Sequence, residues 1–564
     1  MSQSGRGYRA HHPSSPTPLP CLTAYLPSFV FHLSHLSEIA GEEHLVLSHS
    51  TRGTLLGTRL RATLTPITRS TSIYPRPSAP NRAPKHSKPH RTFIHVLDDD
   101  SLLNIFYLYR PDLMEEAETY PTSRLQGGEW DRERWWYKFA HVCRRWRYLL
   151  LASAPYLGLC LVCTRSTPVA DMLAHSPPLP LIVDLLDQHH DITARDEGRI
   201  TLALQQRHRV RRVRLAVPLP KLQNFMMAMD GDFPILDYLY IRPPTKPNAH
   251  LTLPDTLRAP RLRRLVLFNV FCPIGSPLLT TATGVVALSL QNIPPSAYFS
   301  PNDLLQLLSL VRRLETLRIT FPPPPPNRDV ERELLNTPIK TRVALPDLRW
   351  FEFGGESAYL EALLPRMTTP LLEKLHIMLL NPFTSPLPCL LPFMTAARNL
   401  RFSGAGLRFY GGGVGAMLYR DEPRIHAFIY VTCRGLDWQV SSVARIFNIL
   451  SPISSGVVNL SLDYRERSSP PGVHSEADRS QWRGLLRSFN NVKALRVHGS
   501  LVGELSRCLQ WTDGESHMEL LPGLTELSYY RSGDAGLGTD AGDTFSRFVK
   551  ARQIAGRPVS LVRG

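Results

Sequence analysis

The segment Leu262-Arg-Arg-Leu-Val-Leu267 carries the pattern that decides the fold, which is apolar-x-x-apolar-x-apolar. Its last three positions alternate, as in a strand that is buried on one side. The unit recurs at Val210–Leu215, Leu236–Ile241, Val285–Leu290, Leu314–Ile319, Leu348–Phe353, Leu372–Ile377, Ile425–Tyr430, Val457–Leu462, Val492–Val497 and Leu524–Tyr529. Up to residue 375, equivalent positions lie 23 to 34 residues apart. We therefore predict a strand at each copy.

Segments of helical period lie between these strands. They include Asp303–Val311, Tyr359–Leu364, Trp438–Leu450, Ser480–Phe489 and Phe545–Ala551. One strand and one helix per repeat predict an α/β fold with a parallel sheet, and they resemble a leucine-rich repeat. The Asn or Cys that the repeat family places beyond the last apolar position is replaced here by Pro218, Val270 or Ile293. We expect an irregular solenoid over residues 180–564, with strands on one face, helices on the other and loops of uneven length.

A doubly wound α/β enzyme is the alternative for this region, because strand–helix alternation predicts a parallel sheet there too. The sequence holds no Rossmann or phosphate-loop glycine motif, nucleophile elbow or H-E-x-x-H pair. Gly411–Gly415 is the nearest approach to a phosphate cradle, and it is more typical of a flexible loop. His189 and His190 lie beside Asp187 and Asp191, but a turn explains them without a metal. We expect no catalytic activity and no cofactor.

Two helices are predicted upstream of the repeats. Leu97–Tyr109 begins with acidic residues, which suit the positive end of a helix dipole. Arg134–Ala154 places Trp135, Phe139, Val142, Trp146, Leu149 and Leu150 on one stripe, and Pro155 is expected to end it. Between the two helices lies a charged, glycine-containing insert at 110–133. We assign residues 93–160 to one helical module.

This module resembles the F-box, the domain that docks substrate receptors onto the Skp-type adaptor of cullin-RING ubiquitin ligases. The resemblance is carried by the leucine-rich first helix, by Val142-Cys-Arg-x-Trp146 and by Ala154-Pro-Tyr-Leu157. Asp98 stands where the family usually has proline, and the insert resembles those of expanded fungal F-box families. The resemblance implies an adaptor-binding surface made of Leu97, Leu102, Ile105, Phe106, Val142, Cys143 and Trp146. A plain helical hairpin that caps the first strand is the alternative.

The residues between the apolar positions of the repeat should line the concave strand face and bind a protein substrate. Arg214, Tyr240, Arg263, Arg318 and Arg349 are the candidates, since arginine and tyrosine are frequent interface hot spots. The excess of arginine indicates an acidic or phosphorylated partner. We thus expect a substrate receptor that reaches a cullin through the adaptor, or else a repeat scaffold without a ligase contact.

Composition adds limits to this interpretation. Residues 1–92 hold 11 Lys and Arg against 3 Asp and Glu, within a net charge of +17, and they predict a disordered basic leader. Because this tail lacks interleaved aromatic residues and a recognisable fold, we do not expect a nucleic-acid partner. No segment is apolar enough for a membrane span. The eight cysteines are sparse, and Cys160-Leu-Val-Cys163 has no second pair, so we expect buried thiols in the cytoplasm or nucleus.

Overall fold

The computed structural model describes residues 97–111, 134–186, 192–243, 251–322, 338–380, 387–420, 424–465, 479–509, 520–530 and 541–563. All of them belong to one compact unit, residues 73–113 and 127–564. The leader predicted at 1–92 and most of the insert predicted at 110–133 lie outside the described residues. Two other predicted features, the Asp187–Asp191 turn and its histidines, also lie outside them.

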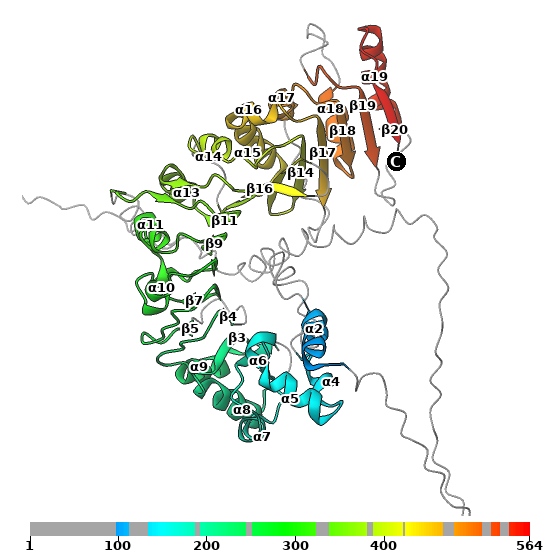
Figure 1. Cartoon of the computed structure of the whole chain (residues 1–564). Coiled ribbons are helices and arrows are strands. Elements are labelled where there is room, and N and C mark those ends of the chain that lie inside the picture. Colours follow the sequence, from blue (N-terminus) through cyan, green and yellow to red (C-terminus); the bar gives the residue numbers. More distant parts are fainter. Residues whose placement is uncertain are drawn as a thin grey trace, which may run out of the picture. The chain divides into compact units, whose positions relative to one another are not determined.

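Within the described residues, sixteen strands form one mixed sheet (Figure 1). In their order across the sheet they are β1 (Leu161–Cys163), β2 (Leu181–Leu186), β3 (Val210–Ala216), β4 (Tyr238–Ile241), β6 (Arg264–Phe268), β8 (Ala287–Gln291), β9 (Thr316–Thr320), β11 (Trp350–Gly355), β13 (Lys374–Leu379), β16 (Ile425–Thr432), β15 (Gly413–Tyr419), β14 (Gly404–Tyr410), β17 (Asn459–Arg465), β18 (Ala494–His498), β19 (Glu526–Tyr530) and β20 (Ser560–Arg563). Every copy of the repeat unit contributes one strand, as predicted. Neighbours are parallel except for β14, β15 and β16, which pair antiparallel around β15.

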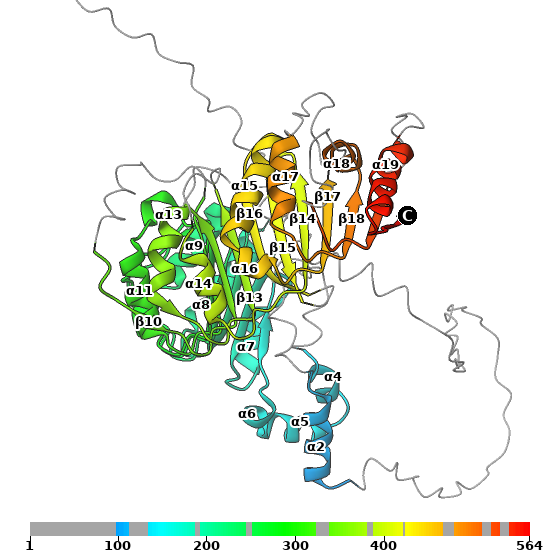
Figure 2. The same cartoon turned by 90° about the horizontal axis from the view of Figure 1, so that it is seen from above.

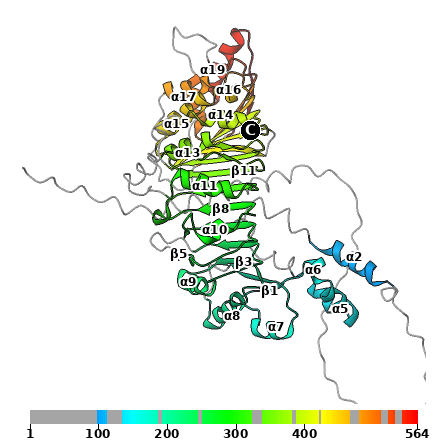
Figure 3. The ribbon, with the colours of Figure 1, turned by 60° about the vertical axis from the view of Figure 1, so that its left-hand side comes forward.

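The strand order follows the chain, apart from the hairpin at β14 and β15, and Figure 3 shows the strands stacked in sequence. A doubly wound sheet would instead reverse its direction at a switch point. The register aligns equivalent apolar positions, since Leu239, Leu265, Leu288, Leu317 and Phe351 pair from strand to strand. The sheet is therefore solenoid-like, in agreement with the predicted repeat. It begins at Leu161, earlier than the predicted residue 180.

The helices of the repeat region pack on one face of this sheet (Figures 1 and 2). They are α7 (Val169–His175), α8 (Ala194–Gln205), α9 (Leu219–Ala228), α10 (Pro277–Thr281), α11 (Pro301–Leu310), α13 (Ser357–Leu363), α14 (Leu390–Ala396), α15 (Leu436–Ile449), α16 (Ser451–Ser454), α17 (Arg479–Arg487), α18 (Leu501–Leu509) and α19 (Ala541–Ile554). Two short parallel pairs, β5 (Leu251–Thr252) with β7 (Val270–Phe271) and β10 (Val343–Ala344) with β12 (Met367–Thr368), lie outside the main sheet. One continuous apolar core fills the space between sheet and helices. Because strand side chains alternate, the residues between the core positions lie on the opposite face.

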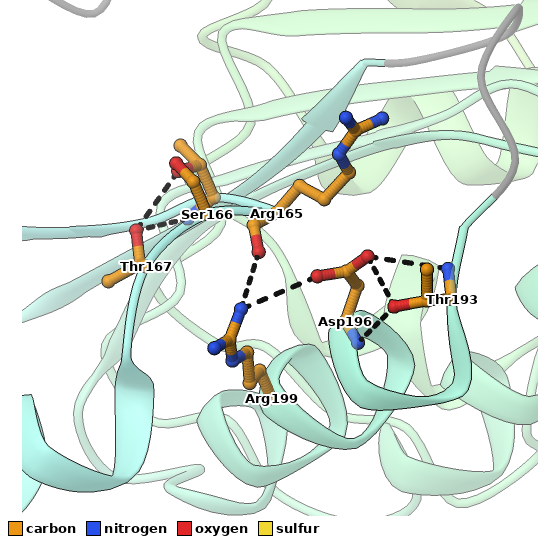
Figure 4. Close-up of polar contacts among 7 residues, drawn as sticks. Arg165, Ser166, Thr167, Thr193, Asp196 and Arg199 are labelled. Carbon is orange, nitrogen blue, oxygen red and sulfur yellow. Dashed lines mark hydrogen bonds and ion pairs between the residues drawn. The ribbon is translucent and has the colours of Figure 1, made fainter.

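A polar cluster fixes the start of α8 (Figure 4). Thr193 and Asp196 form a capping box, in which each side chain bonds the other residue's backbone N–H. Arg199 donates to the Arg165 carbonyl oxygen at 3.3 Å and lies 3.5 Å from Asp196 Oδ1. Helix α8 is thereby tied to the loop after β1. These bonds account for the charged side chains of Asp196 and Arg199, so we assign the cluster a structural role.

The N-terminal module contains α2 (Asp99–Tyr109), α4 (Tyr137–Ala140), α5 (Arg144–Ala152) and α6 (Ala154–Leu157). The prediction of one helix over 134–154 is wrong, because the chain leaves helical geometry before Arg144. Cys143 is extended and caps α5, and its Sγ accepts a hydrogen bond from the Trp146 N–H at 3.5 Å. Pro155 does not end the segment, since it occupies the first turn of α6. Asp98 caps α2, with Oδ1 accepting from Ser101 N–H at 2.7 Å.

Candidate interaction surfaces

The predicted adaptor-binding residues divide into buried and exposed groups. Leu102 and Phe106 are fully buried in the core. Phe106 contacts the rings of Phe139 and Trp146 at centroid distances of 5.4 and 5.2 Å, and both Trp146 and Cys143 are half-buried. Leu97, Ile105 and Val142 are exposed. Four of the predicted residues thus pack inside the module wholly or in part, and three stand on its surface.

Exposed apolar side chains are concentrated in this module. Half of the large apolar side chains that stand exposed among the described residues belong to it, namely Leu97, Ile105, Tyr107, Leu108, Tyr109, Val142, Tyr148 and Tyr156. Ile105, Leu108 and Tyr109 share one face of α2, since they are three and four residues apart. Leu108 is 82% exposed. Large apolar side chains gathered at the surface of a small module are typical of an interaction site.

The module also covers the edge of the sheet. Among the residues that the structure describes, strand β1 pairs with β2 and with no other strand. On its other side, the Trp136 indole N–H donates to the Cys160 carbonyl at 3.2 Å, and the Val162 N–H donates to the Tyr137 hydroxyl at 3.5 Å. Arg134 donates to Thr164 Oγ1 at 3.4 Å. The Trp136 and Tyr137 side chains thus satisfy backbone groups that an edge strand leaves open.

The predicted substrate-binding arginines are mostly paired with carboxylates from neighbouring strands or repeats. Arg214 forms an ion pair with the buried Asp184. Arg318 Nε lies 2.6 Å from Glu352, and Arg349 lies 2.5 Å from Glu373.

The two remaining candidates differ in exposure. Arg263 is exposed just before β6, whereas Tyr240 is buried, at 4% exposure. The recurring arginines therefore form a ladder of ion pairs, so this face carries less positive charge than the sequence alone suggests.

An aromatic strip crosses the face opposite the helices, and sequence analysis missed it. It consists of Trp350, His376, Phe428, Tyr430 and Tyr410, which come from β11, β13, β16 and β14. Successive ring centroids are separated by 5.6, 5.9, 6.3 and 6.2 Å. These distances are typical of aromatic pairs in contact. The signal in the sequence was an aromatic or histidine at the outward position of consecutive repeats.

Glycines in β15 make room for the strip. A Cβ at Gly413 would lie 2.5 Å from the Tyr430 hydroxyl oxygen, and one at Gly415 would lie 2.8 Å from Phe428 Cε2. The rings of β16 therefore lie across the glycine strand. The prediction of a flexible loop at Gly411–Gly415 is wrong, because Gly413 and Gly415 pair within the sheet.

Two cations and one buried donor that has no acceptor within the described ranges accompany the strip. The Arg318 guanidinium and the Lys374 ammonium lie 4.9 and 5.2 Å from the Trp350 ring centroid. The Trp350 indole N–H is buried and has no hydrogen-bond acceptor among the described residues. Burial lowers the pKa of His376 to about 4, so its imidazole is neutral at pH 7. Trp350, Tyr410 and Tyr430 are themselves buried, and the indole N–H lies beside two cations.

Other chemistry is not evident in the described part of the chain. It contains no group of His, Cys, Asp or Glu suited to hold a metal ion and no helix long and apolar enough to cross a membrane. Cys160 and Cys163 are buried free thiols, as predicted, and burial raises the pKa of Cys163 to about 12. A thiol with such a pKa is a poor nucleophile or metal ligand.

No protein-family model and no curated protein matches the chain. Among solved structures, the crystal structure of a TLR13–ssRNA13 complex matches with 11% sequence identity and a TM-score of 0.28. The match covers 71% of this chain and 49% of that one, so it spans about half of the matched protein. A similarity this low supports no argument about fold or function.

Proposed function

We propose that the chain is a substrate receptor of a cullin-RING ubiquitin ligase. In this proposal the F-box-like module binds a Skp-type adaptor, and the leucine-rich-repeat-like sheet binds a protein substrate. The single observation that carries it is the gathering of exposed apolar side chains on the module whose sequence resembles an F-box. Such side chains expose apolar area to water until a partner covers them. Burial of this area would favour binding by about 25 cal/mol per Å².

The adaptor surface is assigned here to residues that are accessible. Leu97, Ile105, Leu108 and Val142 are exposed, whereas Leu102 and Phe106 act from within by holding α2 against α5. Arg145 supports the same arrangement, since it donates to the Leu97 carbonyl at 2.6 Å and pairs with Asp99 at 2.7 Å. The buried residues are thus needed for the shape of the surface and the exposed ones for contact.

A pulldown with a purified Skp-type adaptor tests this half of the proposal. Ile105→Asp and Val142→Asp bring a charge to the proposed interface, and each is expected to cost about 2 kcal/mol or more of binding free energy. Leu310→Asp is the matched control, because Leu310 is 45% exposed on α11 and Ile105 is 40% exposed on α2. Equal adaptor binding by wild type and all three variants, or none by wild type, would reject the ligase assignment.

A repeat scaffold without a ligase contact is the second candidate. The hydrogen bonds that join Trp136 to Cys160 and Tyr137 to Val162 favour it, because solenoids require a cap where the first strand would expose its edge. This candidate predicts that the wild-type chain does not bind the adaptor at all but still captures a protein partner through the sheet. The same pulldown, probed for both, separates the two candidates.

A further inference from the structure

We infer that the outer edge of β20 binds an extended, acidic segment of a partner protein, which pairs with residues 561–563 as a further strand of the sheet. The inference deepens the part of the proposed function that assigns protein binding to the sheet, and it rests on that part alone. It names the place of binding and the class of ligand, and it does not depend on the adaptor.

Strand β20 lies at one end of the sheet and pairs with β19 (Figure 1). The Ser560 N–H donates to the Thr525 carbonyl oxygen at 2.8 Å. Because successive residues of a strand direct their backbone groups to opposite sides, those of Leu561 and Arg563 face away from β19. No group among the described residues bonds them, whereas Tyr137 bonds the backbone of β1. Such an edge can accept a strand from another chain.

The side chains of this edge are accessible, since all four residues of β20 are exposed. Leu561 is registered with Leu527, which is fully buried in the core, yet Leu561 itself is 36% exposed. Val562, on the opposite face of the strand, is 42% exposed. A strand added here would cover both side chains. Apolar residues in that strand would therefore stabilise the pairing.

The last repeat is basic. Residues 544–564 contain five Lys and Arg and no Asp or Glu. Within the described ranges, none of these five side chains forms an ion pair. Arg552 and Arg557 donate instead to backbone carbonyl oxygens, both of them to that of Pro522. The positive charge of this repeat is thus not compensated by its own surroundings, and an acidic ligand would compensate it.

Arg563 brings this charge to the edge itself. It is exposed, and it lies two residues after Leu561 on the same face of β20. Glu526 of β19 is registered with Ser560, so it lies on the other face. A strand with an apolar residue beside Leu561 and an acidic residue beside Arg563 would match both neighbours. Opposite charges on neighbouring strands stabilise a pair of this kind.

Two other occupants fit the edge less well. In a second copy paired antiparallel through β20, Arg563 would face Ser560 and find no carboxylate, while two basic repeats came together. A single-stranded nucleic acid would bring phosphates, but β20 has no aromatic residue on which a base could stack. It would also leave the apolar side chains and the open backbone groups unused.

Fluorescence anisotropy with the full-length chain tests the inference. The probe is the fluorescein-labelled peptide Thr-Glu-Val-Val-Glu-Thr, which reads the same in both directions and so suits a parallel or an antiparallel added strand. It is compared with Thr-Lys-Val-Val-Lys-Thr, with the acidic peptide N-methylated at both valines, and with oligo(dT). We expect the acidic peptide to bind about tenfold more tightly than either altered peptide, because one lacks the charge match and the other lacks backbone donors.

Arg563→Glu should weaken binding of the acidic peptide about tenfold and strengthen binding of the lysine peptide. Arg547→Glu is the matched control, because it makes the same change of charge at an exposed residue of α19, and its effect should be less than about twofold. Leu561→Pro removes an N–H that faces away from β19 and should also weaken binding about tenfold. If circular dichroism shows that Leu561→Pro does not fold, the N-methylated peptide decides whether backbone pairing is involved.

The inference is overturned if the wild-type chain does not bind the acidic peptide, if N-methylation has no effect, or if Arg563→Glu binds like the wild type. Tighter binding of oligo(dT) that Arg563→Glu abolishes would overturn it in favour of a nucleic acid. A dimer in analytical ultracentrifugation that Leu561→Pro dissociates would overturn it in favour of a second copy. Adaptor binding is measured separately, so loss of the ligase assignment leaves the peptide result readable, and the reverse also holds.

Discussion

Arg214 and Arg263 occupy different positions in their repeats and have different surroundings. Arg214 is paired with Asp184, whose side chain is fully buried, and Arg263 is exposed. Arg214→Glu would set two carboxylates together in a buried site, so we expect a loss of about 3 kcal/mol or more in unfolding free energy. Arg263→Glu should change it by less than about 0.5 kcal/mol. Urea unfolding of both variants checks this, and equal midpoints would show that the Asp184 pair contributes little.

His376 should make stability depend on pH. Its pKa is lowered from 6.5 to about 4, first by burial, and Arg318 and Lys374 lower it further while Glu352 opposes them. The unfolded chain therefore binds a proton below pH 6.5 that the folded chain does not bind until about pH 4. Folding stability is lost as pH falls through this window, by up to about 3 kcal/mol for this group.

His376→Phe keeps a ring between Trp350 and Phe428 but cannot be protonated. Thermal unfolding of wild type and variant from pH 7 to pH 4 measures the difference. We expect the wild-type midpoint to fall more steeply below pH 6.5 than the midpoint of His376→Phe. Parallel curves would mean that His376 titrates like a solvated histidine.

At the scale of elements, the contact of Trp136 and Tyr137 with the chain at β1 can be tested directly. Trp136→Phe removes the donor to the Cys160 carbonyl, and Tyr137→Phe removes the acceptor of the Val162 N–H. An unpaired buried backbone group costs about 1–3 kcal/mol. We expect each variant to lower the unfolding free energy by about 1 kcal/mol and to speed amide hydrogen exchange in β1. Unchanged exchange at Val162 would show that the edge is protected by other groups.

The glycines of β15 give a second prediction at this scale. Gly415→Ala places a Cβ 2.8 Å from the Phe428 ring, which must shift, so a loss of about 1–3 kcal/mol is expected. Gly484 lies in α17 with open space around its Cβ position, and Gly484→Ala should stabilise by about 0.5–1 kcal/mol. Opposite shifts of the thermal midpoint are the expected result. A stabilising effect at Gly415 would contradict the packing of ring on strand.

The repeat strands were predictable because each keeps apolar residues at fixed spacing, and the register of Leu239, Leu265 and Leu288 follows from it. The hairpin strands were not. Gly404–Tyr410 and Gly413–Tyr419 contain four glycines, and the place of Gly413 and Gly415 in the sheet depends on aromatic rings from β16. Strand β1 is only three residues long, and its edge is held by residues of another element.

The candidate site likewise was predictable from the sequence only in part. The F-box-like motif was readable as a sequence pattern, but which of its residues are exposed depends on how α2 packs against α5. Phe106 and Ile105 are neighbours in sequence, yet one is fully buried and the other is 40% exposed. The ion pairs of Arg318 and Arg349 could not be predicted from the sequence, because their partners Glu352 and Glu373 come from the next strand or repeat. The aromatic strip could not be predicted either, because it depends on the register of four strands.

For the whole molecule, we predict that residues 1–92 can be deleted without loss of the fold. The leader is rich in Ser, Thr, Pro and His and lacks periodic apolar residues that would offset an ordering cost of about 1–2 kcal/mol per residue.

Deletion of 1–110 is the matched control, since it also removes α2 and with it the fully buried Leu102 and Phe106. By thermal unfolding, the shorter deletion should leave the midpoint within a few degrees. The longer one should lower it markedly, because Trp146, Phe139 and Leu150 lose their packing partners. A fall of tens of degrees for the first deletion would mean that the leader packs on the core.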